Sequence, residues 1–241
     1  MTNRGRFLEL SIPTDAVRES LDFYLRLGFT ELPVNDIRGH FYAVVTDGRI
    51  AIGLHSDGFA EPTLSFVWPD VARHVRELED AGHELTVVEL GIDEFHEVEI
   101  FSPDGHPLRF MEARTFSRRN FRDAPEPAIG RSAEISLRCA DYGAAFAFWE
   151  TADFITEEDA AADPDEELVT LWAPGVMLGL RNGYRWPEPG LRFGQADIDA
   201  TLEELDRRRI AHRRSGTGRL VTAPEGTRLI LVDDERRSAD D

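Results

Sequence analysis

Lysine is absent from this sequence, so all 27 basic residues are arginines, and 46 acidic residues outnumber them. The formal net charge of -19 creates a field that repels nucleic-acid phosphates and anionic lipid surfaces. We therefore expect neither nucleic acid nor a membrane as a partner of this protein.

Cysteine is almost absent as well. The single Cys139 excludes a disulfide within the chain and a metal site made only of thiolates, which is typical of a reducing compartment. No stretch approaches the roughly 20 apolar residues of a membrane-spanning helix, and residues 1–10 lack the apolar run of a signal peptide. We therefore expect a soluble protein located in the cytoplasm.

Internal repetition is the most informative feature that the sequence has. Residues 7–29 and 133–154 each read as a strand, a turn and an amphipathic helix, and Glu9 aligns with Glu134. Residues 63–85 and 190–212 form a second related pair, and strand-like runs follow every copy. The turns S-P-D-G and A-P-E-G match in position. The chain therefore consists of four βαβββ modules, two in each half.

The boundary between the halves is a polar, proline-bearing stretch at residues 115–132, which is typical of a linker. We predict an α+β protein with one domain at residues 1–114, a second at 133–236, and an acidic tail at 237–241. Each domain contains two modules. The sequence leaves open whether modules pair within each half or across the halves.

The module order, the aromatic pairs Phe23-Tyr24 and Phe148-Trp149, and the S-P-D-G-H turn resemble the vicinal oxygen chelate (VOC) superfamily. This superfamily includes glyoxalase I, bleomycin-resistance proteins and extradiol dioxygenases. The resemblance implies two glyoxalase-like domains whose mixed sheets curl around a cavity. It also implies a divalent metal held by the first and last strands of two modules. Because this scaffold hosts isomerases, oxygenases and simple binders, function must be argued from the site.

The implied metal-ligand positions hold residues that suit a metal poorly. In the two halves they are Glu9, Gly53, Thr63 and Arg109, and Glu134, Gly179, Gly190 and Ile230. Glycine offers no side-chain donor, threonine is a poor ligand, and arginine stays protonated. We therefore expect no metal cofactor. A divalent metal would need a non-standard set, such as Glu9 and His55 with Glu97 or Glu99.

Glu9 raises a question because it interrupts an apolar strand. A carboxylate buried without a partner costs several kcal/mol, so we predict that Glu9 pairs with Arg109. The guanidinium would then supply the positive charge that a metal ion supplies in the superfamily. For Glu9 and Glu134 the alternative is a purely structural ion pair or hydrogen bond. For His55 the alternative is an exposed histidine at a strand end, and His106 is also expected to be exposed.

Strand alternation places further polar side chains on the same inward faces. The predicted ligand-binding residues are Glu9, Ser11, His55, Thr63, Ser65, Glu97 and Arg109 in the first half, and Glu134, Arg181 and Arg192 in the second. A polar lining of this kind suits a small molecule as the partner.

The predicted function is binding of a small polar or aromatic molecule without a metal, in the manner of the bleomycin-resistance proteins. The first alternative is a metal-dependent lyase, isomerase or dioxygenase with a rearranged ligand set. The second is an interaction protein whose pockets have decayed. We assign no catalytic residue, so whether the protein is an enzyme stays open. A duplicated chain can replace a homodimer, and both a monomer and a homodimer fit the sequence.

Overall fold

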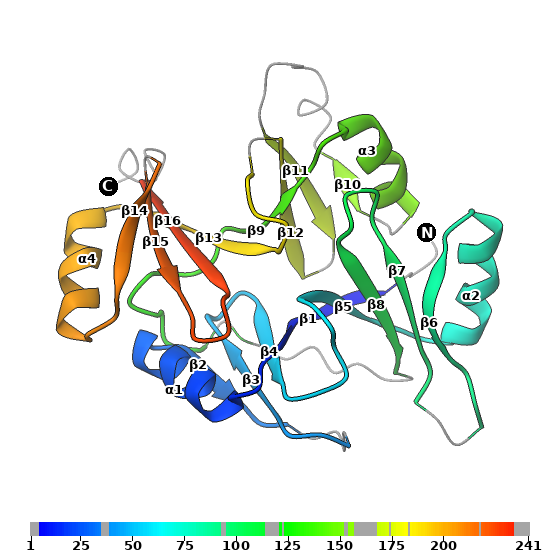
Figure 1. The fold of residues 1–241 in the computed structure, drawn as a ribbon, viewed down its shortest axis with the longest axis horizontal. Coiled ribbons are helices and arrows are strands. Elements are labelled where there is room, and N and C mark those ends of the chain that lie inside the picture. Colours follow the sequence, from blue (N-terminus) through cyan, green and yellow to red (C-terminus); the bar gives the residue numbers. More distant parts are fainter. Residues whose placement is uncertain are drawn as a thin grey trace. The chain divides into compact units, whose positions relative to one another are not determined.

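The computed structural model describes residues 5–34, 39–92, 95–113, 121, 123–151, 154–156, 168–173, 175–182, 184–216 and 218–233. Each module begins with a strand and a helix and continues with three strands, as predicted (Figure 1). The first half contains β1 (Arg6–Pro13), α1 (Val17–Leu27), β2 (Thr30–Leu32), β3 (Tyr42–Thr46), β4 (Ala51–His55), β5 (Thr63–Trp68), α2 (Val71–Asp80), β6 (Leu85–Glu89), β7 (Glu97–Phe101) and β8 (Pro107–Glu112).

The second half repeats the same order. It contains β9 (Glu134–Arg138), α3 (Tyr142–Thr151), β10 (Ile155–Thr156), β11 (Leu168–Ala173), β12 (Val176–Arg181), β13 (Gly190–Gln195), α4 (Ile198–Arg207), β14 (His212–Ser215), β15 (Gly218–Thr222) and β16 (Arg228–Asp233). The fourfold βαβββ plan read from the sequence is therefore confirmed.

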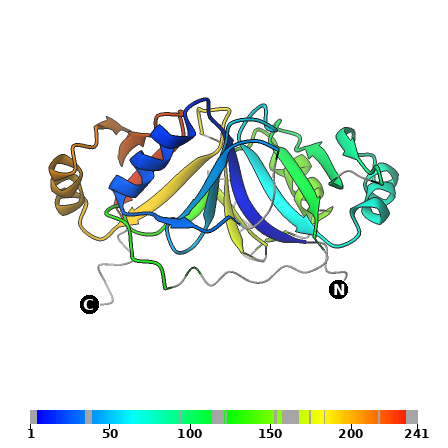
Figure 2. The same ribbon diagram turned by 90° about the horizontal axis from the view of Figure 1, so that it is seen from below.

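Each half of the chain builds one mixed, eight-stranded sheet. The strand orders are β2-β3-β4-β1-β5-β8-β7-β6 and β10-β11-β12-β9-β13-β16-β15-β14. Within a module the hairpins are antiparallel, whereas β5 runs parallel to β8 and β13 runs parallel to β16. The α+β class and the mixed sheets are as predicted. Helix α2 lies alongside β7 and β8, and α4 lies alongside β16 (Figure 2).

The compact units of the structure do not coincide with the halves of the sequence. Unit I comprises residues 1–10, 61–119 and 137–188, which include module 2 (β5–β8) and most of module 3 (β9–β12). Unit II comprises residues 11–60, 120–136 and 189–241, which include most of module 1 (β1–β4) and module 4 (β13–β16). Modules of one half thus share a sheet, while the compact units combine modules from different halves.

Aromatic side chains form much of the core of unit I. Phe66 on β5 lies 5.5 Å from the ring of Phe110 and 5.9 Å from that of Phe154, and Trp68 stacks on Phe110 at 3.8 Å. Trp149 on α3 continues the cluster through Phe154 at 4.9 Å. Since Phe66 and Phe154 come from different halves of the chain, this cluster joins module 2 to module 3.

Helix α1 packs through one apolar face in unit II. Its buried residues are Val17, Ser20, Phe23, Tyr24 and Leu27, a spacing that places them on one side of a helix. The helix ends at Gly28, whose φ of 96° is in the left-handed region and whose N–H bonds to the carbonyl of Leu25. Among the described residues, no helix has the length and apolar character needed to cross a bilayer.

The later part of the expected linker packs against unit II. The N–H of Ala128 donates to the carbonyl of Leu27 at 2.8 Å, and Ile129 is fully buried. The N–H of Ser132 donates to Asp47 on the β3–β4 turn at 2.6 Å. Residues 128–132 therefore belong to the packed structure of unit II.

This packing predicts a difference between two glycines at helix ends. Gly28 and Gly82 both have positive φ, 96° and 84°, where alanine costs about 1–2 kcal/mol. A Cβ at Gly28 would lie 3.3 Å from the Cα of Pro127, whereas one at Gly82 would have nothing within 4 Å. Gly28→Ala should therefore lower the free energy of unfolding more than Gly82→Ala does. Urea unfolding followed by circular dichroism measures both, and equal losses would contradict the packing of residues 127–128 against α1.

Candidate functional site

Arg109 is a buried arginine in the sheet of the first half, within unit I. It sits on β8, opposite Glu99 of β7 and beside Ser65 of β5, and its side chain is buried, with 7% of the residue exposed. Its Nε and Nη2 atoms lie 2.9 and 2.8 Å from Oε2 of Glu99, and Nη1 lies 3.7 Å from Oε1 of Glu97. The guanidinium therefore occupies a fixed position between adjacent strands.

Further groups hold this ion pair and add negative charge around it. The hydroxyl of Thr86 lies 3.3 Å from Oε1 of Glu99, so both oxygens of that carboxylate have a donor. Partial burial raises the pKa of Glu61, and the nearby charges of Glu99 and Glu188 raise it further. The buried cation of Arg109 thus lies beside the carboxylates of Glu99 and Glu97.

The sequence placed Glu97, Glu99 and Arg109 on one face but did not name the pair that the structure shows. The sequence could have predicted the Glu99–Arg109 pair from the turn at residues 102–105. This turn sets the register of the β7–β8 hairpin and brings Glu99 opposite Arg109. Glu9 is buried on β1, with 4% exposed. Its pairing with Arg109 stays a prediction.

The matching face of the second half also carries buried polar groups. Glu134 is 8% exposed, and the hydroxyl of Ser136 donates to its Oε1 at 2.7 Å. Arg192 on β13 lies opposite Glu134 and beside Ile230 in the sheet register. Arg181, at the end of β12, is half-buried. Glu134 and Arg192 therefore lie on one face of the sheet, as expected, while a ligand-binding role for them and for Arg181 stays a prediction.

His55 is fully buried, so the alternative of an exposed strand-end histidine is wrong. Its Nδ1 lies 3.0 Å from Nε2 of His40, its ring stacks on Tyr42 at 5.3 Å, and Phe59 lies 4.7 Å away. Tyr42 faces His55 directly across the β3–β4 hairpin, a register that the turn between these strands indicates. Sequence reasoning missed this histidine–aromatic cluster because it treated His55 alone.

The remaining predicted site residues on these faces are also buried. Ser11 and Ser65 have no exposed surface, and Thr63 has 1%; the Thr63 hydroxyl donates to the carbonyl of Glu61 at 2.8 Å. All residues of β4 and β5 are buried, so the place of these side chains on a ligand-binding face stays a prediction. These residues are held by contacts within the protein, and any ligand would have to compete with those contacts.

The residues at the implied metal positions do not fit a divalent ion. Arg109 places a protonated guanidinium at one of them, and its partner Glu99 is already engaged. His55 directs Nδ1 at His40. Among the residues that the structure describes, no three histidine, cysteine or carboxylate side chains come together as a metal site would require. The absence of a metal from the functional protein stays a prediction.

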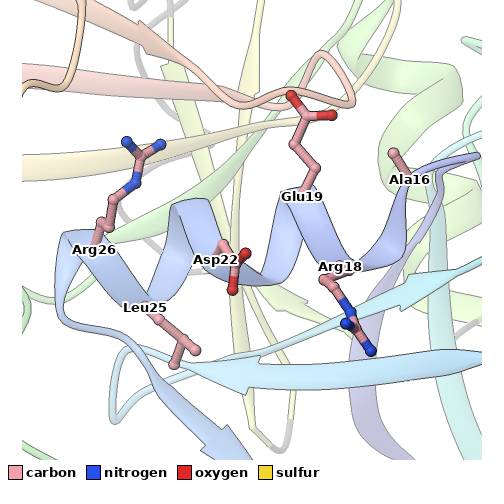
Figure 3. Close-up of a pocket in the computed structure, with 6 residues that line it drawn as sticks. All are labelled: Ala16, Arg18, Glu19, Asp22, Leu25 and Arg26. Carbon is pink, nitrogen blue, oxygen red and sulfur yellow. The ribbon is translucent and has the colours of Figure 1, made fainter.

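A surface hollow of the described structure lies elsewhere, on the outer side of α1. Figure 3 shows the side chains that line it, Ala16, Arg18, Glu19, Asp22, Leu25 and Arg26. Ala16 immediately precedes α1 and the other five belong to it, two of them basic and two acidic. This open hollow contains none of the predicted site residues and brings together no group of chemical interest.

Comparison with known proteins finds likeness at the level of structure. No family model and no curated protein matches the sequence. A homoprotocatechuate 2,3-dioxygenase variant from Brevibacterium fuscum, solved in complex with HPCA, matches 96% of this chain and 71% of its own, with 15% identity and a TM-score of 0.61. A catechol 2,3-dioxygenase matches 95% of this chain and 87% of its own, with 13% identity and a TM-score of 0.58.

A halotolerant catechol dioxygenase also matches, over 96% of this chain and 87% of its own, with 13% identity and a TM-score of 0.54. The chain therefore shares the fold of these dioxygenase structures. The resemblance seen in the sequence is therefore confirmed for the fold. Similarity at this level of identity says nothing about the chemistry of a VOC-fold site.

The buried ion pair predicts a large effect on stability. Removing Arg109 leaves Glu99 buried beside other carboxylates, and breaking a buried pair in this way costs about 3–5 kcal/mol. Arg109→Ala should therefore lower the free energy of unfolding by about that amount, measured by urea unfolding. Arg73→Ala is the control, since the exposed pair of Arg73 with Glu77 contributes less than about 1 kcal/mol. Equal losses in the two variants would contradict a stabilising pair.

Proposed function

We propose that this VOC-fold protein binds a small polar or aromatic molecule on the inward faces of its sheets, without a metal ion. The observation that carries the proposal is the position of Arg109. Its guanidinium stands where the resemblance places a metal ligand, and Glu99 and Glu97 hold it there. A fixed guanidinium offers several N–H donors in one plane, so it can bind the oxygen atoms of a ligand without chelation.

The residues of unit II support the aromatic part of the proposal. The rings of Tyr42 and Phe59 lie 5.3 and 4.7 Å from the ring of His55, and the neighbouring Phe41 is 62% exposed. Aromatic faces of this kind stack on planar ligands. In this proposal the partner is a small molecule, and the protein acts as a monomer or a homodimer in the cytoplasm.

A metal-dependent lyase, isomerase or dioxygenase is the second candidate. What favours it is the likeness of fold to extradiol dioxygenases over 95–96% of the chain. Such an enzyme would need the rearranged set of Glu9 and His55 with Glu97 or Glu99. Three donors with open positions are the minimum for such a catalytic site.

Metal analysis and ligand screening distinguish the two candidates. We expect less than stoichiometric metal after purification, and we expect compounds from a panel of aromatic carboxylates, catechols and aromatic antibiotics to raise the melting temperature equally with and without EDTA. Stoichiometric metal that is lost in Glu9→Ala, or a ligand effect abolished by EDTA, would support the enzyme and overturn the proposal.

A matched pair of variants tests the role of Arg109 in binding. Arg109→Lys keeps the charge but loses the planar arrangement of donors, so we expect at least about tenfold weaker binding of any compound found in the panel. Arg73→Ala, on the outer side of α2, should leave the affinity unchanged. Titration calorimetry measures both. Unchanged binding in a folded Arg109→Lys variant would remove Arg109 from the site.

A further inference from the structure

The two Pro-acid-Gly turns have the same backbone geometry. In the first, residues 102–105, the N–H of Gly105 donates to Ser102 and φ of Gly105 is 84°. In the second, residues 223–226, the N–H of Gly226 donates to Ala223 and φ of Gly226 is 96°. The first turn joins β7 to β8 and the second joins β15 to β16, and both strand pairs are antiparallel hairpins. Each turn therefore presents its acidic residue, Asp104 or Glu225, at the same place.

The first turn contacts module 3 through several hydrogen bonds. Oδ1 of Asp104 accepts the N–H of Ala140 at 2.8 Å, and Nε2 of His106 donates to the carbonyl of Arg138 at 2.9 Å. His106 is only 2% exposed, so the expectation of an exposed histidine is wrong, and burial lowers its pKa. The turn of module 2 is thus bound to the junction of β9 and α3, in the other half of the chain.

The sole cysteine lies under this turn. Cys139 is 1% exposed, and burial together with the charge of Asp104 and a hydrogen bond to it raises its pKa to about 12. While the turn is in place, the thiol is covered and protonated, and a protonated thiol is not a nucleophile. Cys139 is therefore a natural reporter of whether the turn is in contact with module 3.

The second turn makes the reciprocal contact with module 1. Oε1 of Glu225 accepts the hydroxyl of Tyr24 at 2.8 Å. Tyr24 lies on α1 and has no exposed surface, and burial followed by the charge of Glu225 raises its pKa. A buried hydroxyl needs a partner, and this one finds it on the turn of module 4, in the other half of the chain.

We propose that the turns at residues 102–105 and 223–226 are docking elements that hold the two halves of the chain to each other. In each case the last hairpin of one half uses its turn carboxylate to bind the first module of the other half. The partner that each turn fits is a strand–helix or helix surface that offers a donor, which is the exposed N–H of Ala140 for the first turn and the buried hydroxyl of Tyr24 for the second. This role is independent of the proposed ligand.

The thiol of Cys139 tests the first turn in the full-length protein. We expect Asp104→Ala to increase the rate of reaction with DTNB under native conditions by about tenfold, since the hydrogen bonds of the carboxylate to the N–H of Ala140 and to the thiol are lost. Asp104→Asn keeps an acceptor oxygen and should restore most of the protection. Glu225→Ala acts in unit II and should leave the thiol rate unchanged. Far-UV circular dichroism verifies that each variant is folded.

Hydrogen exchange tests the second turn. Tyr24→Phe removes one hydroxyl, and Glu225→Ala removes its acceptor, so both should speed amide exchange in α1 and in β15–β16 by about tenfold, with little change in α3. If Asp104→Ala does not fold, hydrogen exchange in Tyr24→Phe and Glu225→Ala tests the docking proposal by itself. Native thiol protection in folded Asp104→Ala, or equal effects of the Asp104 and Glu225 variants on both units, would overturn the proposal.

Discussion

A buried ion pair between neighbouring strands is the interaction on which the interpretation of the site depends. A guanidinium is a permanent cation in proteins, so burial of Arg109 on β8 requires carboxylates nearby, and Glu99 and Glu97 on the neighbouring strand β7 provide them. The proposed function depends on this permanent charge. A guanidinium attracts oxygen atoms of a ligand directly, and it competes with a divalent ion for the same space.

The crossed arrangement of modules gives the fold a second level of organisation. Backbone hydrogen bonds join the two modules of each half into one sheet, whereas side chains and turns join modules from different halves into compact units. The aromatic cluster around Phe66 and the contacts of Asp104 do this in unit I, and Tyr24 with Glu225 does it in unit II. Stability within a sheet and stability between halves therefore rest on different residues.

The fold of this protein does not by itself determine its function. The match to extradiol dioxygenases extends over nearly the whole chain, yet the positions that would bind a metal hold glycine, threonine and arginine. A fold is specified by many weak apolar contacts that tolerate substitution, while a metal site is specified by three or four donors that do not. The same scaffold can therefore persist after the chemistry has changed.

The sequence by itself determined the module plan, the apolar faces of the helices, the glycine turns and the faces on which polar side chains lie, because these follow from local periodicity and from backbone conformation. It did not determine that Glu99 and Glu97 contact Arg109, that His55 contacts His40 and Tyr42, or that modules join across the halves. Only the tertiary structure decided these, because they depend on strand register and on packing between residues far apart in the chain.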